Sequence, residues 1–173
     1  MRILFYSLVC VLFFSCKSEA EDNLDFDTID YYHLGISDLE ETSIVFKELK
    51  TNKDSTFLSI LFGEIPIKLN DSLIEQIEST NYFKHFELPK ELNAKVSNCF
   101  SNYYEASFFS TSTTCIHFYR DILIFRKEKN IIGIALICFS CNSIIHHSKD
   151  GFQQINLDFV ELQKLLKITT KAD

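Results

Sequence analysis

Two strongly apolar runs separated by three polar residues constrain the fold of this chain most. DILIFRK covers 121–127 and IIGIALICF covers 131–139, with Glu128, Lys129 and Asn130 between them. Runs of this length, rich in β-branched residues and joined by a short polar break, predict an antiparallel β-hairpin. A third run, from Asn142 to His147, extends the predicted sheet.

Three segments carry helix signals. Ser72 and Glu75 have the spacing of a capping box and predict a helix that ends near Thr80. A second helix is expected to begin at Pro89, with Leu92, Val96 and Cys99 at helical spacing on its buried side. The last helix begins near Asp158, and apolar residues line one side of it.

The part of the chain before these helices reads as further strands. TSIVFKELK over 42–50 and STFLSILF over 55–62 predict two strands split by a turn at 51–54, and 64–69 predicts a third. Together the elements predict one α+β domain over 31–173, with a mainly antiparallel sheet and two or three helices packed on it.

The amino-terminal residues predict export. The apolar run over 3–14 reaches only about 18 Å as a helix, whereas a bilayer core measures about 30 Å. A short apolar run after the positive charge of Arg2 is typical of a signal peptide, which we place at 1–15. A buried first strand or helix is the alternative interpretation.

The residues that end this run carry a resemblance. Phe13, Phe14, Ser15 and Cys16 resemble the lipobox of bacterial lipoproteins, in which a small residue precedes a cysteine. The resemblance implies cleavage before Cys16, a diacylglycerol on its thiol and an acyl chain, such as palmitate, on the new amino terminus. Since each buried methylene contributes about 0.8 kcal/mol, several acyl chains on Cys16 would hold the protein at a membrane.

Residues 16–30 predict an acidic, flexible tether, because six acidic residues lie between positions 19 and 30. Calcium binding is the alternative, but the segment lacks the glycine and the terminal glutamate of an EF-hand loop. An acid-rich stretch directly after the cysteine is similar to the export signal of Bacteroidota lipoproteins. That similarity implies an outer-membrane lipoprotein of the cell envelope.

The charge of the chain argues against nucleic acid as a partner. The formal net charge is −7, and removal of residues 1–15 takes away Arg2 but no acidic residue. Such a surface repels phosphate backbones. The expected partners are the membrane, through the lipid on Cys16, and a protein or small molecule that the sequence does not identify.

Four cysteines remain after the signal peptide and Cys16: Cys99, Cys115, Cys138 and Cys141. An even number in an exported domain favours disulfides, while a zinc site made of the four cysteines, a redox pair and plain buried thiols stay open.

Strand geometry selects among the disulfides. If residues 138–141 stay extended, the two Cα atoms lie about 10 Å apart, too far for a bridge between Cys138 and Cys141. Folding the hairpin about 128 and 129 pairs positions whose numbers add to about 257, which brings Cys115 within one residue of Cys141. We therefore expect a Cys115–Cys141 bridge, with Cys99–Cys138 as a second one.

The segment from Cys115 to Cys141 resembles small uncharacterised bacterial lipoproteins in which a cysteine begins one hairpin strand and Cys-Phe-x-Cys ends the other. ICFSC, over 137–141, carries the match. The resemblance supports the hairpin and implies no activity.

Other chemistry-bearing residues give weaker signals. His146 and His147 follow the cysteine pair at a distance that could suit a metal, and His117 lies near Cys115. At most one of the adjacent pair can join a given site, and we interpret the pair as surface histidines near a turn. The sequence carries none of the common catalytic motifs and assigns no catalytic residue or cofactor other than the lipid. We expect a lipid-anchored, non-enzymatic binding or structural module, with a thiol-redox or metal-binding protein using Cys138 and Cys141 as the alternative.

Overall fold

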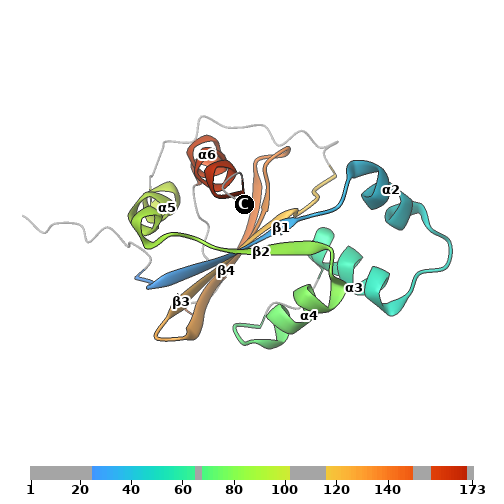
Figure 1. Cartoon of the computed structure of the whole chain (residues 1–173), viewed down its shortest axis with the longest axis horizontal. Coiled ribbons are helices and arrows are strands. Elements are labelled where there is room, and N and C mark those ends of the chain that lie inside the picture. Colours follow the sequence, from blue (N-terminus) through green and yellow to red (C-terminus); the bar gives the residue numbers. More distant parts are fainter. Residues whose placement is uncertain (1–24, 65–67, 102–115, 150–156, 171–173) are drawn as a thin grey trace, which may run out of the picture.

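The computed structural model describes residues 25–64, 68–101, 116–149 and 157–170. A five-stranded antiparallel sheet in the order β2-β1-β3-β4-β5 forms the centre (Figure 1). Its strands are β1 (Thr28–Leu34), β2 (Phe83–Glu87), β3 (Asp121–Lys127), β4 (Asn130–Cys138) and β5 (Ser143–Ser148). The α+β class with a mainly antiparallel sheet is confirmed.

Helices cover both faces of this sheet (Figure 1). They are α2 (Asp38–Phe46), α3 (Asn52–Leu61), α4 (Ser72–Thr80), the 3₁₀ turn η1 (Lys90–Leu92), α5 (Asn93–Ser101) and α6 (Phe159–Thr170). Residues of α5 and α6 pack on one face, which we call the upper face, and residues of α3 and α4 pack on the other, the lower face.

The two central strands explain why the sheet is buried on both sides. Along β3, Leu123 and Phe125 pack on the upper face, whereas Ile122 and Ile124 pack on the lower face. All four side chains are fully buried. Successive strand residues point to opposite faces, so a continuous apolar run can fill two cores only when both faces are covered. The continuous apolar runs of the predicted hairpin therefore require helices on both faces of the sheet.

Helices α2 and α3 replace two predicted strands. Thr51 and Asp54, expected in a turn between strands, form the capping box that begins α3. Its buried residues Phe57, Ile60 and Leu61 recur at helical spacing, and their apolar character alone did not distinguish helix from strand. The prediction of strands over 42–50 and 55–62 is therefore wrong.

The helices predicted over 72–80, after Pro89 and near the carboxyl end are confirmed as α4, η1 with α5, and α6. The capping box predicted at Ser72 and Glu75 is wrong, because Asp71 is the N-cap residue of α4 and makes no side-chain cap hydrogen bond. The strands of the hairpin and the run after it are confirmed as β3, β4 and β5. In the predicted strand over 64–69, residues 65–67 lie outside the described residues and the rest is not strand.

The sheet begins inside the segment predicted as a tether. Thr28, Ile29 and Asp30 belong to β1, and Ile29 is fully buried. The predicted signal peptide, Cys16 and the tether up to residue 24 lie outside the described residues. Within the described ranges, none of the helices has the length and hydropathy needed to cross a bilayer.

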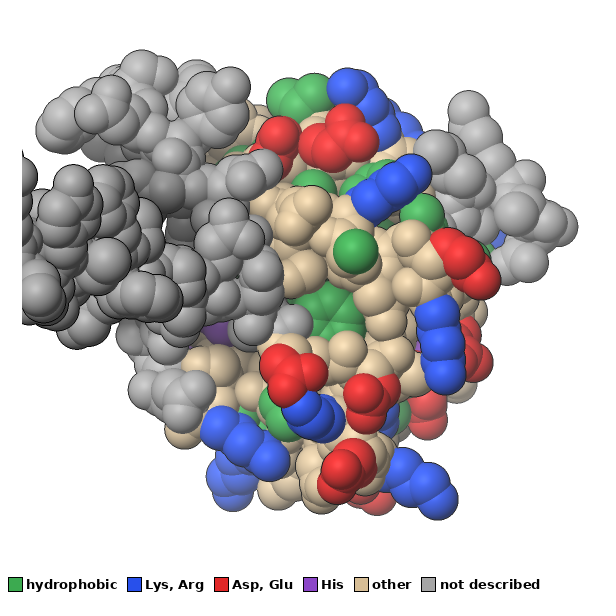
Figure 2. All heavy atoms as spheres, turned by 90° about the vertical axis from the view of Figure 1, so that its left-hand side faces the viewer, with side chains coloured by type: hydrophobic (Ala, Val, Ile, Leu, Met, Phe, Trp, Pro, Cys, Tyr) green, Lys and Arg blue, Asp and Glu red, His purple; other side chains and the backbone are tan. Residues whose placement is uncertain are grey.

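Charges are mixed on one side of the molecule. Acidic and basic side chains are interspersed on the face seen in Figure 2, and neither sign gathers into one patch there.

Candidate functional site

Three metal-ligating or nucleophilic side chains meet at one end of β4. His117 comes from the segment before β3, Cys138 is the last residue of β4, and Cys141 lies in the turn that leads to β5. A ring nitrogen of His117 and the Sγ atoms of Cys138 and Cys141 all lie within 4.8 Å of one another. Cys138 is buried, whereas His117 and Cys141 are half-buried. We call this group the sheet-end site.

The register of the hairpin explains why His117 belongs to this site. Next to the loop, Lys127 pairs with Asn130, so the residue numbers add to 257 as predicted. A bulge between Phe125 and Arg126 then changes the sum to 258, as in the pair of Asp121 with Ile137. At this end of the ladder Asp121 pairs with Ile137, so the segment before Asp121, which carries His117, lies beside the end of β4 at Cys138.

A turn brings the two cysteines together. β4 ends at Cys138 and β5 begins at Ser143, and Asn142 has a left-handed backbone with φ of 46°. The segment 138–141 is therefore not extended, and the expectation that its ends lie about 10 Å apart on opposite faces is wrong. Cys141 packs against the lower-face core that contains Cys138.

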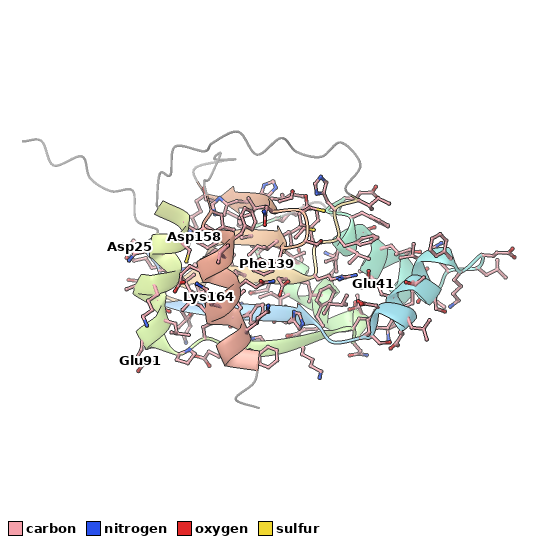
Figure 3. All side chains as sticks on the ribbon, turned by 90° about the horizontal axis from the view of Figure 1, so that it is seen from above. Asp25, Glu41, Glu91, Phe139, Asp158 and Lys164 are labelled. Atoms are coloured by element: carbon pink, nitrogen blue, oxygen red, sulfur yellow. The ribbon has the colours of Figure 1, made fainter. Side chains whose placement is uncertain are left out.

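The turn is held from both faces of the sheet. Phe139 packs on the upper face, where its ring makes an edge contact with Phe159 of α6 at 6.4 Å between centroids. Figure 3 shows Phe139 beside α6. Ser140 lies between the two sulfurs, with Oγ 3.3 Å from Sγ of Cys138 and 3.9 Å from Sγ of Cys141.

Tyr119 fixes the segment that carries His117. The backbone N–H of Tyr119 donates to the carbonyl of Leu61 at 2.8 Å, and its hydroxyl lies 3.2 Å from Oγ of Ser143. The His117 ring stacks on that of Tyr119, with 6.3 Å between centroids and an interplanar angle of 24°. Nδ1 of His117 is buried and makes no hydrogen bond. Such an orphaned ring nitrogen favours a ligand or a transferred proton at this position.

A guanidinium lies close to Cys138. The Nε atom of Arg120 is 2.9 Å from a carboxylate oxygen of Glu41 on α2. The pKa of Arg120 is raised, chiefly by its hydrogen bond to Glu41 and to a smaller extent by the charge of Cys138. The guanidinium is thus paired with two carboxylates of α2, those of Glu41 and Asp38.

Cys99 lies on the other side of the sheet from Cys138. Cys99 belongs to the upper-face core and Cys138 to the lower-face core, and both are free thiols. The predicted Cys99–Cys138 bridge is therefore wrong, because the sheet separates the two sulfurs. For the same reason Cys99 cannot complete a metal site with Cys115, Cys138 and Cys141. Burial raises the pKa of the Cys99 thiol to about 11, with smaller contributions from Asp158 and Glu161.

Cys115 lies outside the described residues, so the Cys115–Cys141 bridge stays a prediction. Cys141 is not among the free thiols. Its Sγ lies 3.5 Å from the carbonyl oxygen of Ile116, the residue that directly follows Cys115.

The other histidines of the predicted group do not join the site. His146 pairs across the sheet with Ala135 on the upper face and is only 1% exposed. Its interpretation as a surface histidine is wrong, since the side chain packs near the ring of Phe100. His147 is half-buried.

A second polar cluster, near Asp121, looks structural. The Asp121 carboxylate accepts a hydrogen bond from the Tyr31 hydroxyl at 2.6 Å and lies 2.8 Å from Nδ1 of His33. Burial and the neighbouring Asp121 raise the pKa of Tyr31. The buried carboxylate thus has its hydrogen bonds satisfied by residues of the same sheet, and the cluster holds β1 to β3.

No protein-family model, curated protein or solved structure matches this chain. Function is therefore inferred from the residues of the sheet-end site themselves.

Proposed function

We propose that this chain is a lipid-anchored envelope protein whose domain carries out thiol–disulfide exchange at Cys138 and Cys141. The observation that carries the proposal is the meeting of two cysteine sulfurs and one imidazole within 4.8 Å of one another. It favours the redox interpretation of the sequence over the non-enzymatic binding module, for which the described residues offer no comparable group of side chains.

Cys141 and Cys138 differ in solvent exposure and therefore have different roles in the exchange. The half-buried Cys141 can bond to the sulfur of another cysteine or of a small thiol. The buried Cys138 is shielded from outside thiols and lies beside Cys141, so it is the thiol that resolves such a bond. A buried resolving thiol next to a more exposed one keeps the exchange directed.

The exchange step balances without an added oxidant. The Cys138 thiolate attacks Sγ of Cys141 while Cys141 is bonded to another sulfur. The new S–S bond joins Cys138 to Cys141, and the former partner leaves as a thiolate. The proton of Cys138 passes to a ring nitrogen of His117 and from there to the departing sulfur.

The predicted Cys115–Cys141 bridge fits this scheme as a resting form. Attack by Cys138 on that bridge would release the Cys115 thiol and close the Cys138–Cys141 bond. A substrate cysteine bonded to Cys141 would leave in the same way.

A trapping experiment tests the proposal. The full chain with Cys115→Ser is compared with the chain carrying both Cys115→Ser and Cys138→Ser, after reduction and exposure to oxidised glutathione. Trypsin releases residues 130–149 as one peptide, because no lysine or arginine lies between Lys129 and Lys149. Mass spectrometry of this peptide reports the state of Cys141.

We expect the double variant to keep one glutathione on Cys141, because the resolving thiol is absent. The single variant should lose the glutathione and form the internal bond. Cys99→Ser, added to either chain, is the matched control and should change neither result, since Cys99 lies in the other core. Equal glutathione adducts in the single and double variants would contradict the proposal.

The location is proposed from the amino-terminal residues alone. We propose that Cys16 carries the lipid and that the acidic segment after it directs the protein to the outer membrane. Mass spectrometry of the amino-terminal peptide from the membrane fraction should find acyl chains on Cys16. An intact leader on protein from the soluble cell interior would contradict the location and leave the trapping result unaffected.

A further inference from the structure

The reduced sheet-end site has the donor set of a metal centre. Two thiolates and one imidazole are ligands that Zn²⁺ prefers, and they come from three separate places in the fold. Carboxylates, which harder cations such as Ca²⁺ require, are not part of this group of three.

The distances allow one ion to reach all three donors. In a tetrahedral zinc site, with bonds of about 2.3 Å to sulfur and about 2.1 Å to nitrogen, neighbouring donor atoms lie roughly 3.6–3.8 Å apart. The three donors lie within 4.8 Å of one another in a structure where Cys141 is not among the free thiols, and in the reduced protein closure around an ion needs shifts of about 1 Å. Cys141 and Ser140 lie in a turn between strands, where such a shift does not disturb the ladder.

The environment of the donors supports a ligand there. Nδ1 of His117 is buried and makes no hydrogen bond, although the ring is held by its stack on Tyr119. Oγ of Ser140 lies near both sulfurs and can donate to a metal-bound thiolate. Hydrogen bonds of this kind orient metal ligands and tune their affinity.

We infer that the reduced protein binds one Zn²⁺ ion through His117, Cys138 and Cys141. The inference concerns the same residues as the proposed exchange but does not depend on it, because metal binding needs only that both thiols are reduced. Oxidation of either cysteine removes a ligand, so bound metal and a disulfide at Cys141 exclude each other.

The test titrates the reduced full chain with Co²⁺, a spectroscopic probe for zinc sites, in a non-thiol reductant. We expect one ion per chain, an absorption band from thiolate-to-cobalt charge transfer, and displacement of Co²⁺ by Zn²⁺. His117→Ala should weaken binding at least tenfold, and Cys138→Ser should abolish the charge-transfer band or strongly reduce it. His85→Ala, which changes a partly exposed histidine on β2, is the matched control and should leave binding unchanged.

Two results would overturn the inference. One is the absence of stoichiometric Co²⁺ binding by reduced protein that retains the native circular dichroism spectrum. The other is unchanged binding in His117→Ala together with a loss in Cys115→Ser, because the donors would then be a different set. Since this titration is done on fully reduced protein, failure here leaves the trapping experiment as an independent test of the exchange.

Discussion

The buried His146 makes the stability of the domain depend on pH. Its side chain is 1% exposed, and neither ring nitrogen has a hydrogen-bond partner. Burial, with a smaller contribution from His147, lowers the pKa of His146 from 6.5 to about 4. The folded protein therefore holds His146 neutral at pH values where the unfolded chain protonates it.

The sign and size of the effect follow from proton linkage. Between pH 6.5 and pH 4 the unfolded chain binds more protons than the folded one, so stability falls as the pH is lowered through this window. Above pH 6.5 the residue has no such effect. The loss is about 2 kcal/mol at pH 5 and approaches about 3 kcal/mol below pH 4, at about 1.4 kcal/mol per pKa unit.

Urea unfolding followed by circular dichroism at pH 7, 6, 5 and 4.5 measures this loss for the wild type and for His146→Leu. The leucine variant should lose about 2 kcal/mol less than the wild type between pH 7 and pH 5. His85→Ala leaves His146 intact and should keep the wild-type dependence. Equal losses in the wild type and His146→Leu would show that His146 does not cause the pH dependence.

Three further substitutions test the fold. Gly63→Ala should lower the free energy of unfolding in urea by about 1–3 kcal/mol, because Gly63 has φ of 70° and an added Cβ would lie 2.5 Å from Ile145. Gly35→Ala is the control and should cost less, because the atoms nearest to an added Cβ belong to the flexible side chain of Lys84. Asp54→Asn should lower the free energy of unfolding at pH 7. The difference in unfolding free energy between wild type and variant should shrink as the pH falls below 3.8, because the pKa of Asp54 is lowered, chiefly by its hydrogen bond from Lys47. Lys129→Gly should raise the free energy of unfolding by roughly 0.5–1 kcal/mol, because Lys129 has a left-handed backbone with φ of 72° in the β3–β4 loop.

The sequence predicted the centre of the fold because its signals are local. The β3–β4 hairpin follows from two apolar runs and a short polar break, and the helix over 72–80 follows from its own apolar face. The strands β1 and β2 were not foreseen. β1 begins inside the acidic segment and β2 is a short edge strand, and both pair with residues distant in sequence.

The site was predicted only in part, for a reason of register. The cysteine pair was visible in the sequence, but a bulge between Phe125 and Arg126 shifts the pairing by one residue, and the chain turns after Cys138, so the predicted pairing does not extend to Cys141. Sequence spacing alone could not show the bulge or the turn after Cys138. The separation of Cys99 from Cys138 likewise depends on which face of the sheet each helix covers.

The most direct test of the account is the state of the 130–149 peptide under a defined redox potential. The full chain carrying Cys115→Ser is equilibrated with mixtures of reduced and oxidised glutathione, alkylated and digested with trypsin. We expect Cys138 and Cys141 to convert together from two alkylated thiols to one internal disulfide, while Cys99 stays a thiol throughout. Two thiols that remain alkylated in the most oxidising mixture, or a stable glutathione on Cys141, would contradict it.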